Sequence, residues 1–120
     1  MAQAFQDLTV WQRAMEMTVC VYSLTQAFPK NEMYGLTSQL HRAAVSVASN
    51  IAEGRGRMTD GEFRQFLGIA QGSTYEVQTQ LLVAEGLKMD DEQVLRHGQA
   101  LCVETSKMLG AFIPSLGARG

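Results

Sequence analysis

Two histidines, His41 and His97, are the residues of this chain that would most readily bind a metal ion in a helical protein. A di-iron or di-manganese centre in a helix bundle uses Glu-x-x-His pairs, because residues three positions apart place both ligands on one inward helix face. Here Ser38 and Val94 stand three residues before the two histidines, so neither pair exists. We therefore expect no metal centre and no cofactor, and we interpret both histidines as surface or interhelical hydrogen-bonding groups.

Three carboxylates, Glu53, Glu76 and Glu85, could in principle supply acid–base chemistry. Glu76 directly precedes an apolar residue of a helical stripe, and a charge at the edge of a core needs a partner. We therefore interpret Glu76 as a carboxylate paired with Arg42 or with another cation. The sequence contains no nucleophile elbow, no phosphate-binding loop and no dinucleotide-binding glycine pattern. We expect that the protein is not an enzyme.

The two cysteines, Cys20 and Cys102, are far apart in the sequence and each has apolar neighbours. There is no C-x-x-C motif, so a zinc knuckle or a thioredoxin-type site is not indicated. Reduced thiols in a core are the expected state of such residues in the cytoplasm. No apolar run approaches the roughly 20 residues that span a bilayer. The sequence predicts a cytoplasmic protein that does not enter a membrane.

Three arginines, Arg55, Arg57 and Arg64, lie close together in the sequence and could contact the phosphates of a nucleic acid. Asp60 and Glu62 stand between them and partly cancel their charge, and the net charge of the chain is −2. In a single copy this segment is typical of a solvated loop. A closed ring of copies would bring the same cluster together several times and multiply its local charge.

The apolar spacing places these residues on four helices, because apolar residues recur every three or four positions rather than every two. We predict helices over about 8–27, 36–53, 60–85 and 91–113. Short connections make neighbouring helices antiparallel. The sequence thus predicts an all-α protein, an antiparallel up-down-up-down four-helix bundle that forms a single domain over residues 1–120.

The expected helix ends follow from residue types that favour caps and stops. We predict that Asp7 and Asp90 cap the first and last helices, and that Thr59 begins a capping box, T-D-G-E, before the third. Pro29 should end the first helix and Pro114 the last, because proline disfavours helix at the residue before it.

The helix expected over 36–53 carries the most regular apolar stripe, together with many small residues. We predict that it is the innermost helix, and that its backbone approaches Gly68 and Gly72 of the next helix, where interior glycine would otherwise cost stability. Its core stripe is Leu36, Leu40, Ala43, Val47 and Ile51. A narrow polar line, which we expect to form hydrogen bonds between helices, comprises Arg42, Ser46, Asn50 and Glu53, with Glu76 on the following helix.

The helix expected over 8–27 carries two apolar stripes, although one is enough to build a bundle. We assign the first to the core: Trp11, Ala14, Met15, Thr18, Val21, Tyr22, Thr25 and Phe28. The second stripe, at heptad spacing, is Val10, Met17 and Leu24. It could be covered by the rest of the bundle or by another subunit, and we predict that it forms part of a subunit contact.

Several motifs in order along the chain resemble one known family. They are F-x-D-L-x-V-W from Phe5, F-P at Phe28, Y-G-L-T-S-Q-L from Tyr34, R-A-A-V-S-V-x-S-N-I-A-E-G from Arg42, E-F-x-x-F-L from Glu62 and G-S-x-x-E-x-x-T-Q-L from Gly72. Over about residues 5–113 the chain is similar to the bacterial four-helix-bundle proteins encoded by intervening sequences in 23S ribosomal RNA genes. It is more distantly similar to Avd, the accessory protein of diversity-generating retroelements.

The resemblance implies a cytoplasmic bundle that assembles into a ring, typically a homopentamer. Relatives of the Avd type are strongly basic and bind nucleic acid and a reverse transcriptase, whereas this chain has more acids than bases. We therefore expect a non-enzymatic, homo-oligomeric assembly or interaction protein, whose first partner is itself. The alternative hypothesis is an accessory protein that binds RNA, or another protein, through a basic face of the ring, with Arg55, Arg57 and Arg64 as the contacts.

Overall fold

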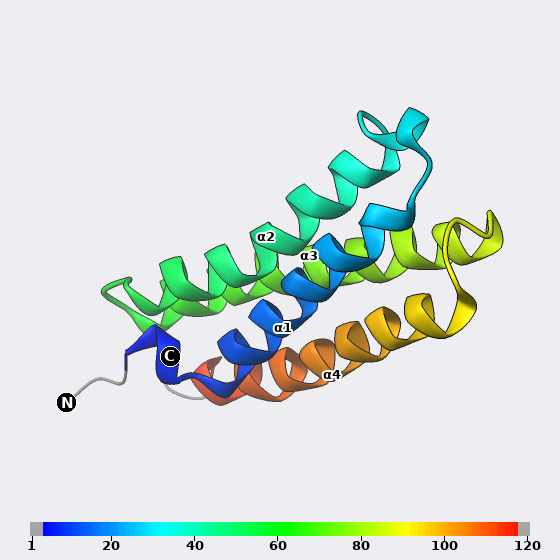
Figure 1. The fold of residues 1–120 in the computed structure, drawn as a ribbon. Coiled ribbons are helices and arrows are strands. Elements are labelled where there is room, and N and C mark those ends of the chain that lie inside the picture. Colours follow the sequence, from blue (N-terminus) through cyan, green and yellow to red (C-terminus); the bar gives the residue numbers. More distant parts are fainter. Residues whose placement is uncertain (1–3, 118–120) are drawn as a thin grey trace.

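The computed structural model describes residues 4–117, and every regular element within this range is a helix. Four long α-helices are joined by short connections: α1 (Thr9–Leu24), α2 (Leu36–Arg55), α3 (Asp60–Gly86) and α4 (Glu92–Gly117). Short 3-10 turns precede α1 and occupy the connection from α1 to α2. Consecutive helices run in opposite directions, as Figure 1 shows. The predicted all-α four-helix bundle is confirmed, and no helix within residues 4–117 is long and apolar enough to cross a membrane.

The four helices form a closed square, in which each packs mainly against two neighbours: α1 against α2 and α4, and α3 against α2 and α4. Helices α1 and α3 therefore lie diagonally opposite each other, as do α2 and α4 (Figure 1). The prediction that α2 is innermost is wrong, because its outer residues Arg42, Val45 and Ser49 are exposed. A square of four helices has no central member, so each helix has one buried side and one outer side.

The core runs along the inner sides of all four helices. The stripe predicted for α2 is buried except at its first residue, Leu36, which is half-buried. Around it pack the inner residues of α3, with Leu67, Val77 and Leu81 fully buried, and Leu95 and Leu109 of α4. Two threonines, Thr74 and Thr105, are also fully buried, and each satisfies its hydroxyl by donating to the backbone carbonyl one turn earlier.

The helix ends agree with the predicted caps at one of three places. The Thr59 hydroxyl accepts a hydrogen bond from the backbone N–H of Glu62 at 3.1 Å, so the predicted cap of α3 is present. Helix α1 begins after Leu8, since Asp7 already belongs to the preceding 3-10 turn. Helix α4 begins one residue later than predicted. The Asp91 carboxylate, rather than that of Asp90, accepts from an N–H of its first turn, at 2.8 Å.

The prediction that Pro114 ends α4 is wrong, because the helix continues through it to Gly117. Proline removes one backbone hydrogen bond and strains its turn, so an extension beyond it needs other support. Leu116 supplies this support by packing into the core, while Arg64 of α3 donates from Nη1 to the Leu116 carbonyl oxygen at 3.3 Å. At the other proline, α1 ends at Leu24 and a 3-10 turn, Thr25–Ala27, completes the segment predicted as helix.

Helices α2 and α3 approach each other closely at Gly54, which is buried near the end of α2. A Cβ at this position would lie 2.7 Å from the Cβ of Phe66 and 2.9 Å from Cδ1 of Phe63. The prediction that α2 approaches Gly68 and Gly72 is wrong, because no atom of α2, or of any other described segment outside α3, lies within 4 Å of a Cβ at either position. The next helix begins only a few residues after Gly54, and the short turn forces the two backbones together there.

We predict that Gly54→Ala destabilises the fold by about 1–3 kcal/mol, because an added methyl group would overlap atoms close to the α3 backbone. Gly110→Ala is the matched control, since a Cβ there makes only ordinary contact with Gln71 at 3.9 Å. The control should be unchanged or more stable by up to about 1 kcal/mol. Urea unfolding followed by circular dichroism measures both, and equal stability of the two variants would contradict the prediction.

Candidate functional site

The residues predicted to form a subunit contact lie inside the single chain. Val10, Met17 and Leu24 are exposed by 6%, 0% and 3%, respectively. Helix α4 covers them: the sulfur of Met17 lies 3.5 Å from that of Cys102, and Leu24 packs over Gly98. The prediction of a subunit contact at these residues is therefore wrong. The rest of the bundle covers this stripe, which is the alternative that the sequence left open.

The outer side of α1 carries other apolar residues, two of which the sequence assigned to the core. Met15 and Tyr22 are exposed, and Val19 between them is 64% exposed. With Gln12 and Gln26, which are also exposed, they form a stripe spaced by three and four residues. We call these five residues the α1 face: Gln12, Met15, Val19, Tyr22 and Gln26.

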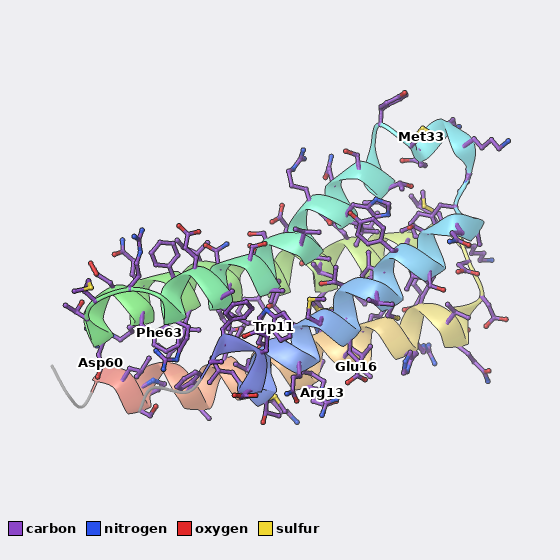
Figure 2. The ribbon with its side chains drawn as sticks, turned by 60° about the vertical axis from the view of Figure 1, so that its left-hand side comes forward. Trp11, Arg13, Glu16, Met33, Asp60 and Phe63 are labelled. Carbon is purple, nitrogen blue, oxygen red and sulfur yellow. The ribbon has the colours of Figure 1, made fainter. Side chains whose placement is uncertain are left out.

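No charged residue belongs to the α1 face. The two charges of α1, Arg13 and Glu16, lie at the edge next to α4, and Figure 2 shows both side chains there, directed away from the core. Arg13 is ion-paired with Glu16, and its Nε lies 2.7 Å from a carboxylate oxygen of Glu104 on α4. These pairs leave the middle of the outer side of α1 without charge.

A second uncharged stripe follows the outer side of α3. Tyr75 and Leu82 are exposed, by 53% and 52%. Gly68, Gly72 and Thr79 lie on the same side of the helix and are also exposed. The five residues follow one another at spacings of four, three, four and three. We call these five residues the α3 face: Gly68, Gly72, Tyr75, Thr79 and Leu82. From Gln65 to Ala84 the sequence of α3 contains one charged residue, Glu76, which lies beside this face.

The two faces lie on opposite sides of the molecule, because α1 and α3 occupy diagonal corners of the bundle (Figure 1). The outer sides of the other two helices are charged. Helix α2 exposes Arg42 and Glu53, and α4 exposes Arg96, Glu104 and Lys107. Around the bundle, uncharged and charged sides therefore alternate.

The predicted polar line divides into two groups. Ser46 joins α2 to α3, because its hydroxyl is 3.0 Å from that of Ser73. The half-buried Asn50 donates its amide to the Ser46 carbonyl at 2.8 Å, a bond within α2. Arg42, Glu53 and Glu76 are exposed instead. Within residues 4–117 Glu76 forms no ion pair with Arg42 or with another cation, so its predicted pairing is wrong. Both sit on outer sides, beyond the seam where α2 and α3 meet.

The three arginines considered for nucleic acid lie at the end of the bundle where α2 passes into α3. The guanidinium carbon of Arg57 lies 4.6 Å from the centre of the Phe66 ring. Its Nη2 also lies 3.8 Å from Oε2 of Glu53. Arg64 donates a hydrogen bond to the Leu116 carbonyl oxygen near the end of α4. Arg55 is half-buried and, within the described part of the chain, forms no ion pair.

The groups that could perform chemistry are held in unreactive surroundings. Burial raises the pKa of the Cys102 thiol to about 12, with a smaller contribution from nearby Cys20, whose own pKa is also raised by burial. Burial lowers the pKa of His41, whose Nε2 lies 2.8 Å from the Thr25 hydroxyl. Among the residues that the model describes, no three His, Cys, Asp or Glu side chains gather as metal ligands would.

An open apolar groove of about 380 Å³ lies between the start of α1 and the end of α4. Its lining is almost entirely apolar, and Thr9 is the one polar residue among those that line it. The residues around it are Leu8, Thr9, Val10, Met108, Ala111 and Phe112.

We predict that Cys102 resists alkylation in the folded protein. At pH 8 a thiol with a pKa of about 12 is ionised in roughly one molecule in ten thousand, and only the thiolate reacts quickly. Iodoacetamide treatment followed by mass spectrometry of peptides should find Cys102 unmodified in the native chain and fully modified after unfolding in urea. Rapid labelling of Cys102 in native protein would show that α1 and α4 separate readily.

The fold and these surfaces define a helical-bundle protein whose most distinctive features are two uncharged faces. The sequence matches the family model of the 23S rRNA-intervening sequence proteins over residues 6–111. This match covers most of the chain, and the protein therefore belongs to that family.

A solved structure supports the same fold. The chain is similar to the crystal structure of a protein of unknown function from the S23 ribosomal protein family of Bacteroides thetaiotaomicron, with a TM-score of 0.80 and 20% sequence identity. The similarity covers 88% of this chain and 98% of that one. A search of curated proteins finds no match.

Proposed function

We propose that this protein is a non-enzymatic, cytoplasmic protein that works by assembling with copies of itself. The assembly is a homo-oligomeric ring, with five copies as the family resemblance implies. The observation that carries the proposal is the α3 face, an uncharged outer side of a long helix that contains two glycines.

The glycines carry most of this argument. Gly68 and Gly72 lie inside α3, where each is expected to cost about 1 kcal/mol relative to alanine. Apart from the backbone of α3 itself, nothing within residues 4–117 lies within 4 Å of a Cβ placed at either position. The bundle therefore gains nothing from them. Glycine on a helix surface does have a use when another helix packs closely against it.

The surrounding side chains support the same conclusion. Isolated exposed apolar residues are normal on protein surfaces, but a contiguous uncharged patch marks an interaction site. Tyr75 and Leu82 extend the glycine stripe, while Ile69 and Val83 are exposed beside it. Tyrosine is enriched at protein interfaces, and lysine and glutamate are depleted there. The composition of this helix side is that of an interface.

We predict that the purified protein has a mass several times the 13.2 kDa of one chain, and that Leu82→Glu lowers it. A charge buried without a partner in a contact weakens association by several kcal/mol, or about a hundredfold or more. Ala100→Glu, at an exposed position on the charged outer side of α4, is the matched control and should keep the wild-type mass. Sedimentation velocity measures all three. A wild-type protein that sediments as one chain at about 50–100 µM would refute the proposal.

Nucleic-acid binding is a second candidate function, favoured by one observation: Arg55, Arg57 and Arg64 gather at one end of the bundle. Arg57 and Arg64 already have partners within the chain, which reduces what they can offer to phosphate. In a ring, every copy would contribute its Arg55, so the ring could hold several arginines on one rim.

We predict that, if this second function operates, structured RNA binds the protein at low salt and Arg55→Ala together with Arg57→Ala weakens the binding. Removing two phosphate contacts should lower the slope of log affinity against log salt by about 1.5–2. Arg42→Ala together with Arg96→Ala, on the outer sides of α2 and α4, is the control that also removes two arginines, at other places. Fluorescence anisotropy at several salt concentrations measures the slopes, and no binding at 50 mM salt would end this candidate.

A further inference from the structure

We propose that the copies join head to tail, with the α1 face of one copy packed against the α3 face of the next. This inference rests on the proposed self-assembly and specifies the surfaces that carry it. The sequence suggested a contact through the residues Val10, Met17 and Leu24, which are buried. The contact proposed here uses the ten exposed residues of the α1 face and the α3 face.

The position of the two faces decides the type of contact. They lie on opposite sides of the bundle, so a contact between unlike faces leaves one free face of each kind at the two ends of any pair. Such a contact continues from copy to copy, and it forms a ring where the rotation between neighbouring copies closes and a filament where it does not. A two-fold contact between like faces would stop at two copies and leave one uncharged face of each copy in water.

The two faces are similar in length and period. The α3 face runs from Gly68 to Leu82 and extends over about 21 Å at 1.5 Å per residue. The α1 face extends over about 18 Å from Gln12 to the end of α1 at Leu24, and Gln26 continues it in the 3-10 turn that follows. Both repeat at alternating spacings of three and four, the mean period at which two helices stay in contact along a shared seam. A partner helix for the α3 face is thus present in the chain itself.

The shapes of the faces are complementary. The α1 face presents the large side chains of Met15, Val19 and Tyr22, while the α3 face is lowest at Gly68 and Gly72, where no side chain projects. Tyr22 is held in place before association, because its ring stacks on that of His41 at 3.8 Å between centroids and 15° between planes. A fixed side chain loses less conformational freedom when it is buried in a contact.

The charges permit this pairing. Arg13 and Glu16, the charged residues that border the α1 face, already pair with each other and with Glu104 on their own chain. Packing of α3 against α1 therefore leaves no unpaired charge of α1 in the contact. Glu76, the one charge of α3 beside the α3 face, is exposed at its edge, where it stays in water. The charged outer sides of α2 and α4 would remain in water.

Mixing two variants tests the pairing. Val19→Glu places a charge in the α1 face and leaves the α3 face unchanged. Leu82→Glu places a charge in the α3 face and leaves the α1 face unchanged. In a head-to-tail contact, each variant alone is a single chain at 100 µM, and an equal mixture forms dimers that contain one copy of each. Sedimentation velocity gives the masses, and native mass spectrometry with one isotopically labelled variant identifies the mixed dimer.

The other outcomes separate the failures. If Val19→Glu alone still forms dimers, or if Leu82→Glu alone does, the contact joins like faces and the head-to-tail pairing is overturned. If both stay single and the mixture does too, the pairing is overturned as well, while an oligomeric wild type would keep the proposed self-assembly. A wild type that is itself a single chain overturns the self-assembly. Circular dichroism on each variant checks that the bundle is folded.

Gly72→Leu gives an independent test of the shape argument. Leucine is a better helix former than glycine, and nothing in the chain obstructs a side chain there, so the single chain should be at least as stable as the wild type. The large side chain should nevertheless raise the dissociation constant of the assembly tenfold or more. An unchanged constant would show that the α3 face is not in close contact with a helix.

Discussion

A square of four helices can bury only one side of each helix, and this constraint governs the whole molecule. Every helix here has two neighbours, and its remaining side faces water. The inner sides are fixed by packing and tell little about function. The outer sides are not needed for the fold, so a consistent pattern among them indicates another requirement. In this protein the pattern is an alternation of uncharged and charged sides around the bundle.

The sequence was sufficient to predict the four helices and the buried side of α2. Apolar residues at spacings of three and four gave the number of helices, their order and the buried stripe of α2. The Thr59 cap was also predictable, because it depends on residues only three positions apart. The two prolines show the limit of local rules. Pro29 follows the end of a helix, whereas Pro114 lies within one, since Leu116 and Arg64 stabilise the turn beyond it through contacts that no local rule contains.

The sequence alone could not decide which residues of the two α1 stripes are buried. The second stripe is buried throughout, and the first is buried at Ala14, Val21, Thr25 and Phe28. Both candidate stripes contain large apolar residues at helical spacing. The choice depends on α4, where Gly98 leaves room for Leu24, and Cys102 meets Met17. Such contacts link residues more than seventy positions apart, and only the assembled bundle reveals them. The prediction for α1 therefore assigned Met15 and Tyr22 to the core, although they are exposed. It assigned Met17 and Leu24 to a subunit contact, although they are buried.

The glycines show why the same residue type has two meanings here. Gly54 is required by the fold, because the α2–α3 turn brings Phe63 and Phe66 against it. Gly68 and Gly72 have no such neighbour, although the sequence pattern suggested one. A close approach was a reasonable inference from interior glycines, but the chain provides no partner for them. If these glycines serve a contact, the approaching backbone belongs to another molecule, and the chain itself carries an uncharged helix side of similar length on its opposite face.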